Sequence, residues 1–178
     1  CIQWYSFYSN RNVAQHRVFH LGDCLKTKHE MFTEKLLNQK IGVFGSMNLR
    51  PSKKYSIYIP DPWTETDSDE SLSSRLVSMT MRQLVNQNAQ LKLSFKSILG
   101  LFVLFNSQSL FYDFKVILKS IISFFKKERS VLASTFDYFF LNYSLKRIKK
   151  NKINLGLIFL NGFAHIQHHY LFNSKFIE

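Results

Sequence analysis

The stretch INLGLIFL, residues 153–160, is followed at once by NGFAHIQHH, residues 161–169. A nearly continuous apolar run of this length is typical of a strand buried on both faces of a parallel sheet. In open α/β sheets, ligands bind just beyond the carboxyl ends of such strands. The sequence therefore predicts a buried parallel strand at 153–160 and a ligand site in the residues that follow it.

Both helical and strand patterns precede this strand in the sequence. The segment TKHEMFTEKLLNQ, residues 27–39, has Thr27 at an N-cap position and Glu30 three residues later, a capping box that predicts an amphipathic helix. The runs KIGVFGSMN, residues 40–48, and YSIYIP, residues 55–60, are rich in β-branched and aromatic side chains and predict strands. A helix that leads directly into a strand favours an α/β fold.

The middle of the chain has a different character. Five of the twelve acidic residues lie between positions 61 and 70, in a Ser/Thr-rich, turn-prone stretch that indicates a linker or exposed loop. Beyond it, apolar residues recur at helical spacing and predict that residues 75–150 are mainly helical. These residues are Val77, Met81, Leu84 and Val85, then Phe114, Ile117, Leu118, Ile121, Ile122 and Phe125, then Phe136, Phe139, Phe140 and Tyr143.

The expected organisation is therefore an α/β core interrupted by helices. Residues 1–64 and 151–178 would form parts of one sheet-containing core, and residues 65–150 would form a helical insertion or cap. A chain of 178 residues with 46% hydrophobic residues can bury a core of its own.

The net charge and the spacing of the cysteines limit the class of protein. A net charge of +12 predicts an anionic partner, whether phosphate, nucleic acid or a membrane headgroup. Cys1 and Cys24 have neither metal-finger nor CxxC spacing, which favours a reducing compartment such as the cytoplasm.

The longest apolar run, residues 98–105, is shorter than the ~20 residues of a membrane-spanning helix, so no transmembrane helix is predicted. The opening CIQWYSFYS has no initiator Met and no signal peptide, so we expect an internal piece of a longer protein.

Potential metal ligands follow the predicted strand at 153–160. If the chain becomes helical after Asn161, then Asn161 and His165 are i and i+4 neighbours that can converge on one point, with His168 and His169 a turn further on. Imidazole nitrogen and amide oxygen suit Zn²⁺ or another first-row metal. The alternative is the polar end of a helix, whose histidines make ordinary hydrogen bonds.

Two N-terminal segments, residues 3–23 and 41–48, resemble in pattern and order the alkaline phosphatase superfamily, in particular its type I phosphodiesterase and nucleotide pyrophosphatase-like branch. In that superfamily a Thr or Ser nucleophile is followed by an aromatic residue such as Trp4. A turn of small residues such as 9–10 and a histidine such as His16 come next. A helix and a strand follow, and a much later strand ends in Asp-x-x-x-His, which supplies metal ligands.

The resemblance implies a two-metal site. Asn161 and His165 stand where the superfamily has Asp-x-x-x-His, so His165 would be a ligand of one metal and Asn161 would replace the usual carboxylate. Arg17 stands where a Gly commonly follows the turn histidine. The nucleophile would lie immediately before Cys1, and an Asp-His pair that completes the metal centre would follow Glu178, so the present chain alone is expected to be inactive.

Other residues are candidates for the same site. His168 and His169 would act as a ligand, a substrate contact or a donor to a ligand, with an ordinary structural role equally open. Asn48, after the strand at 41–45, is a candidate substrate contact, although asparagine more often forms the turn itself.

By resemblance, the full-length protein would be a metal-dependent phosphodiesterase- or phosphatase-like hydrolase that acts through a Thr or Ser phospho-enzyme, with two divalent metals, expected to be zinc. The helices at 65–150 would cover the active site, and their basic character favours a polyanionic or lipid-linked phosphate ester. The alternative is a basic helical module that binds nucleic acid or an anionic membrane surface without catalysis. No RNA- or DNA-binding motif accompanies the lysines, and aromatic residues at helical spacing usually form a core, which argues against nucleic acid.

Overall fold

The computed structural model describes residues 2–36, 38–86, 94–105, 110–125 and 129–162. The chain divides into two compact units. We call Cys1–Val103 with Arg147–Phe159 the sheet unit, and Leu104–Lys146 with Leu160–Glu178 the helical unit. The predicted insertion at 65–150 is thus divided between them, since the whole of α4 and most of α5 belong to the sheet unit.

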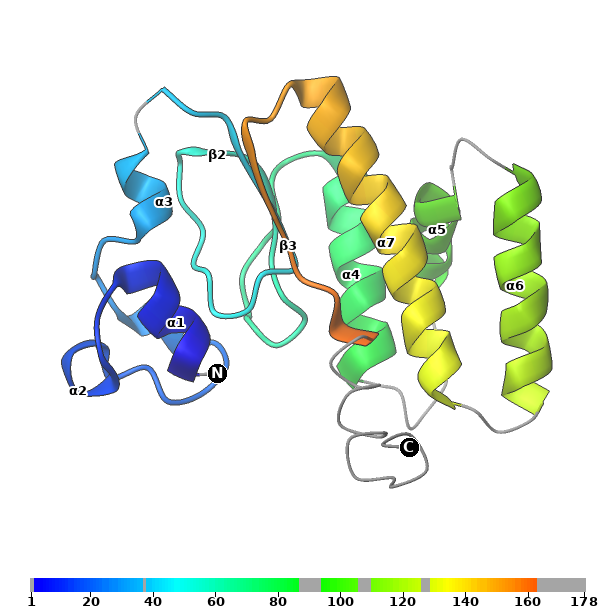
Figure 1. The fold of residues 1–178 in the computed structure, drawn as a ribbon, viewed down its shortest axis with the longest axis horizontal. Helices are drawn as coiled ribbons and strands as arrows, with labels where there is room; N and C mark the ends of the chain where they lie inside the picture. The colour runs from blue at the N-terminus through cyan, green and yellow to red at the C-terminus, as the bar shows by residue number, and fades with distance from the viewer. Residues whose placement is uncertain (1, 37, 87–93, 106–109, 126–128, 163–178) are drawn as a thin grey trace, which may run out of the picture. The chain divides into compact units, whose positions relative to one another are not determined.

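The order of elements is α/β, as the sequence predicts (Figure 1). The helices before the sheet are α1 (Ile2–Ser9), α2 (Val13–His16), the 3₁₀ helix η1 (Asp23–Lys26) and α3 (Phe32–Lys35). The strands are β1 (Ile41–Phe44), β2 (Tyr55–Ile59) and β3 (Leu155–Ile158), and between β2 and β3 come α4 (Leu72–Asn86), α5 (Phe95–Phe105), α6 (Leu110–Phe125) and α7 (Arg129–Asn151). The mainly helical character predicted for residues 75–150 is confirmed across the described part of that segment.

All three strands run parallel in the order β2-β1-β3. Ile41 pairs with Tyr55 on one side and with Leu155 on the other. The prediction that residues 41–45 and 153–160 contribute strands to one sheet is therefore confirmed, although 114 positions separate the paired residues Ile41 and Leu155.

Burial varies across the sheet. Every residue of the central strand β1 is buried, whereas β3 is only partly buried and its Gly156 is exposed. The expectation that 153–160 is buried on both faces is therefore wrong. Among the described residues β3 pairs with β1 alone, so it forms an edge of the sheet and keeps part of its surface open to solvent.

The core of the sheet unit lies between β1 and the N-terminal helices. Ile41 and Val43 of β1 join one hydrophobic cluster with Tyr5 and Tyr8 of α1. Figure 1 shows α1 and α3 on one side of the sheet and α4, which contacts β2, on the other. Helices therefore cover both faces, which is the usual arrangement around a parallel sheet.

The helix expected over residues 27–39 is much shorter, and its predicted cap is wrong. Thr27 lies in extended backbone at the end of η1, and only α3 is helical in this stretch. The Thr27 hydroxyl accepts hydrogen bonds from the His29 N–H (3.2 Å) and from the Tyr5 hydroxyl (3.3 Å). The His29 contact is local and compatible with a cap, whereas Tyr5 and Arg50 hold Thr27 from distant parts of the chain, and no helix begins there.

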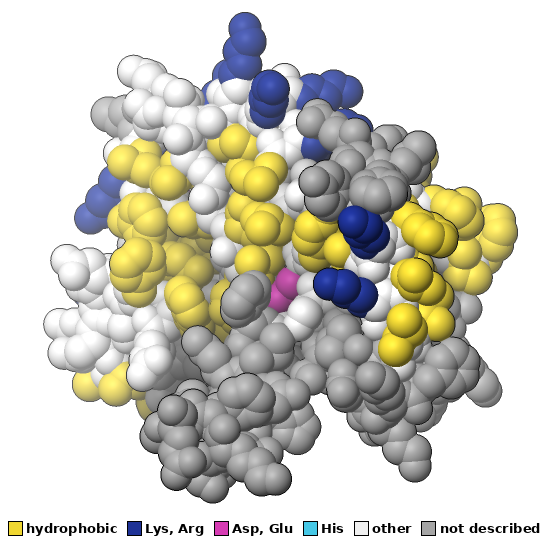
Figure 2. Space-filling model, turned by 45° about the vertical axis from the view of Figure 1, so that its right-hand side comes forward, with side chains coloured by type: hydrophobic (Ala, Val, Ile, Leu, Met, Phe, Trp, Pro, Cys, Tyr) yellow, Lys and Arg dark blue, Asp and Glu magenta, His cyan; other side chains and the backbone are white. Residues whose placement is uncertain are grey.

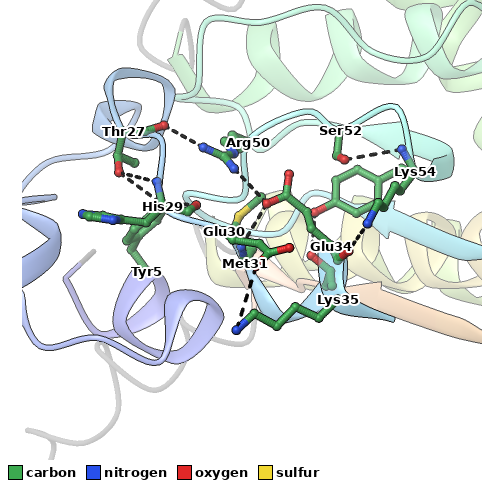
Figure 3. Close-up of polar contacts among 12 residues, drawn as sticks. Tyr5, Thr27, His29, Glu30, Met31, Glu34, Lys35, Arg50, Ser52 and Lys54 are labelled. Carbon is green, nitrogen blue, oxygen red and sulfur yellow. Dashed lines mark hydrogen bonds and ion pairs between the residues drawn. The ribbon is translucent and has the colours of Figure 1, made fainter. Parts of the chain in front are cut away.

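Glu34, rather than Glu30, closes the first turn of α3 and also anchors the loop after β1 (Figure 3). Its carboxylate accepts a hydrogen bond from the Met31 N–H at 2.9 Å and pairs with the Arg50 guanidinium at 2.8 Å. Arg50 also donates to the Thr27 carbonyl at 2.7 Å. This partly buried ion pair ties the segments before and after β1 together.

Asp69 joins β2 to the beginning of α4. Its carboxylate accepts hydrogen bonds from the Tyr58 N–H (3.0 Å), the Ser71 N–H (2.9 Å) and the Ser74 hydroxyl (2.8 Å). Burial raises the pKa of this carboxyl, but the hydrogen bonds from Ser71, Tyr58 and Ser74 outweigh burial, so the pKa lies below its ordinary value. The carboxylate is therefore stabilised in the folded state.

Candidate functional site at the carboxyl edge of the sheet

The loops that follow β1 and β2 begin side by side, because the strands are parallel neighbours. Gly45 and Asn48 both have positive φ, 67° and 53°, a backbone conformation that Gly and Asn adopt more readily than other residues. The Gly45 N–H donates to the Ile59 carbonyl at 2.8 Å, which holds the two strand ends together. The chain thus turns sharply at the edge where open α/β sheets bind ligands.

Asn48 is completely buried at this edge. Its side-chain oxygen accepts from the Gly22 N–H at 2.8 Å, and its side-chain nitrogen donates to the His20 carbonyl at 3.1 Å. Its own N–H donates to the Asp61 carboxylate at 3.0 Å. The structure thus places the Asn48 amide on protein partners in the interior, where it connects the loop before η1 to the sheet.

Asp61 is the acceptor that organises both loops. One carboxylate oxygen accepts from the Asn48 N–H and, at 2.6 Å, from the Thr64 hydroxyl. The other accepts from the Trp63 N–H at 3.0 Å and the Thr64 N–H at 2.9 Å. Asp61 and Thr64 are fully buried, so the reading of this stretch as an exposed loop is wrong at its first residues.

Two further polar groups lie buried near Asp61. Burial raises the pKa of the Tyr8 hydroxyl to about 12, while its hydrogen bond with Ser46 lowers it and the Asp61 charge raises it. Burial, reinforced by the Asp61 charge, likewise raises the pKa of the Cys24 thiol to about 12. Both groups therefore stay protonated at neutral pH, and Cys24 is not a thiolate nucleophile.

His16 has a structural position close to α1. Its Nδ1 accepts from the Val18 N–H at 2.9 Å, and its Nε2 lies 2.8 Å from the Ser6 hydroxyl. Since Nδ1 is an acceptor, the neutral ring carries its proton on Nε2. Burial, with a smaller contribution from His29, lowers the pKa of His16, which favours this neutral form.

The carboxyl end of β3 meets the N-terminal helix. The Phe159 ring lies edge-to-face against Trp4 of α1, with ring centroids 5.5 Å apart. The Phe159 N–H donates to the Phe44 carbonyl at 3.0 Å, and the Ser46 hydroxyl donates to the Leu157 carbonyl at 3.2 Å. Residues near the start of the chain and residues beyond position 150 thus converge at one edge of the sheet.

The predicted metal ligands lie just after this convergence in the sequence. Asn161 is partly buried and begins a helical turn. His165, His168 and His169 lie outside the described residues. Within the described ranges, no three His, Cys, Asp or Glu side chains gather closely enough to hold a metal ion. Asp61 is the buried carboxylate at this edge, but protein donors contact both of its oxygens.

A polar hollow of about 610 Å³ lies beyond the carboxyl end of β2. Trp63, Glu65 and Asp67 line it from the loop, and Arg82 and Asn86 line it from α4. Asn86 donates to the Pro62 carbonyl at 2.9 Å, and Arg82 donates to the Thr64 carbonyl at 3.0 Å. The hollow is open and polar, and it is large enough for a hydrated polar group.

The residues that the sequence analysis missed are Asp61, Thr64, Tyr8 and Ser46. A usable signal was present in DPWT, residues 61–64, because an Asp followed three residues later by Thr is typical of a local side-chain-capped turn. Tyr8 and Ser46 carry no such local pattern, and only the folded chain brings them together.

Comparison of the chain with protein-family models, curated proteins and solved structures found no match.

Proposed function

We propose that this chain is part of a metal-dependent phosphoesterase similar to the alkaline phosphatase superfamily, acting through a Thr or Ser that precedes Cys1. The observation that carries the proposal is the contact between Trp4 and Phe159. It brings the segment next to Cys1 to the end of the strand that leads to Asn161. These two segments must meet for a nucleophile and its metal ligands to share one site.

The backbone around the N-terminal motif supports the same assignment. Asn10 has φ 52° at the turn after α1, where the superfamily has a turn of small residues. Arg17 has φ 55°, a conformation that favours Gly, and it occupies the position where the superfamily commonly has Gly. The fold at this position therefore keeps the geometry of a glycine turn although the residue is Arg.

The proposed metal ligands are Asn161 and His165. Amide oxygen and imidazole nitrogen are both donors that zinc accepts, so the chemistry of this pair fits the group. When bound, two divalent metals would supply charge stabilisation at the phosphoryl oxygens and activation of the attacking oxygen. His168 and His169 remain proposed contacts of the substrate or of a ligand, whereas the structure gives Asn48 a structural role, because its amide is buried on protein partners.

The described residues would prepare the edge of the sheet for this chemistry. Asp61 fixes the loops after β1 and β2 through buried hydrogen bonds, and Asn48 fixes the loop at residues 20–22. Loops held in this way lose little freedom when a substrate binds, which lowers the entropic barrier to reaction. We propose that the polar hollow beside Trp63 binds the part of the phosphate ester that is remote from phosphorus.

A second candidate function rests on charge. Residues 72–151 contain thirteen Lys and Arg residues against three Asp and Glu, a net charge of +10. This favours an anionic partner for the helices, which is compatible with a polyanionic or lipid-linked phosphate substrate and also with binding without catalysis.

The test uses the full-length protein encoded by the gene. Wild type, His165→Ala and Asn161→Asp are compared for bound metal and for hydrolysis of bis-p-nitrophenyl phosphate, with His20→Ala as a control at an exposed histidine. We expect His165→Ala to lower both quantities, and Asn161→Asp to strengthen metal binding because it restores a charged ligand. His20→Ala should change neither. Unchanged metal content and rate in both site variants would exclude the proposal.

A further inference from the structure

Two polar side chains of α6 are buried against α7. In the helical unit, the Ser120 hydroxyl donates to the Val116 carbonyl at 2.7 Å and forms a hydrogen bond with the Thr135 hydroxyl of α7. Asp113 accepts a hydrogen bond from the Tyr138 hydroxyl of α7 at 3.3 Å. Asp113 and Ser120 are both buried. Polar side chains thus mediate part of the contact between these two helices.

The outer face of the same helix is apolar. The Phe114 side chain is 64% exposed, and the other three large side chains of this face are about half exposed. Their spacing of four, three and one places them on one stripe of the helix. The exposed stripe consists of Phe114, Leu118, Ile121 and Ile122.

The α4–α5 pair of the sheet unit has the same arrangement. A methyl group at Gly100 of α5 would lie 2.5 Å from the Leu76 carbonyl oxygen, so the helices approach closely at this residue. The Thr80 hydroxyl of α4 donates to the Ser97 carbonyl at 2.9 Å. Ser97 and Thr80 are completely buried. Small and polar residues therefore line this contact as well.

The outward face of α5 carries the large apolar side chains. Phe102 is 68% exposed, although it is the kind of side chain that water-soluble helices bury. The exposed residues follow the i, i+3, i+4, i+7 pattern of a single helical face. They are Phe95, Ile98, Leu99 and Phe102.

The charges around these stripes are positive. Asp113 and Asp137 are buried, so neither places a negative charge on the surface of its helix. Lys96 on α5 and Lys115 and Lys119 on α6 are exposed beside the stripes. On the face drawn in Figure 2, hydrophobic and Lys or Arg side chains are visible and acidic groups are scarce.

The exposed stripes differ from what is expected for a helix in water, which buries most of its large apolar side chains. In lipid, helices pack through small and polar residues and turn their large apolar side chains outward. At about 1.5 Å per residue, the 11 residues of α5 and the 16 residues of α6 extend about 16 Å and 24 Å, less than the ~30 Å hydrocarbon core. Apolar stripes flanked by lysines on helices of this length fit the interfacial layer of an anionic membrane.

We propose that α5 and α6 dock this protein on the surface of a membrane that contains anionic phospholipid. Their apolar stripes enter the boundary between headgroups and acyl chains, and the neighbouring lysines contact lipid phosphates. Each large side chain that leaves water for this layer contributes hydrophobic free energy, and each lysine near the surface contributes electrostatic attraction to the lipid phosphates. The inference does not depend on the phosphoesterase proposal, because no residue of the candidate catalytic site takes part.

The test is co-sedimentation of the full-length protein with vesicles. One set contains phosphatidylcholine alone, and the other contains equal amounts of phosphatidylcholine and phosphatidylglycerol. The double variant Phe102→Ser, Phe114→Ser removes one large side chain from each stripe. Phe19→Ser, at an exposed Phe in the loop before η1, is the matched control. A second double variant, Lys96→Gln with Lys119→Gln, isolates the charge.

We expect binding to the phosphatidylglycerol vesicles and its loss in about 1 M salt, where the Debye length is about 3 Å. The double Phe variant should bind at least about tenfold more weakly, and the double Lys variant about thirtyfold more weakly, while Phe19→Ser binds as wild type. Circular dichroism of each variant establishes that its helices are intact.

Three results would overturn the inference. The first is no binding to the anionic vesicles, and the second is binding that the Phe substitutions leave unchanged or that Phe19→Ser reduces equally. The third is a dimer that forms without vesicles and dissociates in the double Phe variant while no vesicle binding occurs. That result would assign the stripes to contact with a second copy of the chain.

Discussion

Strand β1 and most of helix α5 belong to the same unit but distribute their apolar side chains in opposite ways. All four residues of β1 are buried, including Phe44, whereas α5 exposes Phe95 and Phe102 and buries Ser97. Transfer of apolar surface out of water explains the first pattern and opposes the second. The sheet is thus organised by its own core, whereas the outer face of α5 keeps large apolar side chains exposed, which is the observation that the membrane-docking proposal explains.

The same substitution, Phe to Ala, made once in β1 and once in α5 gives the largest expected difference in stability between the two elements. Phe44→Ala should destabilise the protein by about 3–5 kcal/mol, because it leaves a cavity in the core beside β1. Phe102→Ala should change stability by no more than about 0.5 kcal/mol, because the ring is mostly exposed. Denaturant unfolding measures both. Similar losses for the two variants would contradict the assigned exposures.

A second pair compares a buried with an exposed carboxylate in the same loop. Asp61→Asn should lower the free energy of unfolding by about 2–3 kcal/mol. The buried carboxylate has two acceptor oxygens for four protein donors, whereas an amide has only one acceptor oxygen. Asp67→Asn, at an exposed position, should stay within about 0.5 kcal/mol. Denaturant unfolding measures both variants. An Asp61→Asn variant as stable as wild type would contradict the role of Asp61 in holding the two loops.

Gly100→Ala tests the close contact between α4 and α5. Ala is favoured over Gly within a helix, yet a new methyl group would meet the Leu76 backbone, so we expect a net loss of about 1–3 kcal/mol. Gly156→Ala in β3 is the control, because its new methyl group meets the flexible end of the Ile148 side chain, which can move. A Gly100→Ala variant more stable than wild type would show that the helices are further apart than described.

The smallest expected effect concerns pH. The pKa of Asp69 is lower in the folded than in the unfolded protein, so its stabilisation is complete above the unfolded value of about 3.9 and is lost as pH falls below it. Asp69→Asn should therefore be less stable than wild type at neutral pH, by about 1 kcal/mol. Unfolding measured at pH 7 and near pH 3 should show this difference shrinking, and a constant difference would contradict the role of the carboxylate.

Much of the fold follows from local sequence patterns. The apolar runs around Ile41 and Leu155 identify two strands, and periodicity identifies the helices between them, because both signals come from neighbouring residues. The helix predicted at Thr27 failed because contacts from distant Tyr5 and Arg50 engage the capping residue. Contacts with residues far away in the sequence produce no pattern in the residues next to Thr27.

The candidate site was less accessible to sequence reasoning. Acidic and hydroxyl residues after position 60 suggested exposure, yet Asp61 is buried because backbone donors satisfy it. Periodicity marked Phe114 and Phe140 equally as apolar helical positions, but the structure exposes the first and buries the second. A periodic pattern shows that a helix has an apolar face without showing what that face contacts.

The most direct test of the account is the location of zinc in crystals of the full-length protein, determined from anomalous scattering at the zinc edge. We expect zinc about 2.0–2.1 Å from an imidazole nitrogen of His165, with Asn161 beside it, at the end of β3 that meets Trp4. Zinc bound elsewhere with His165 remote from it, or His165 on the opposite side of the sheet from Cys1, would contradict the phosphoesterase assignment.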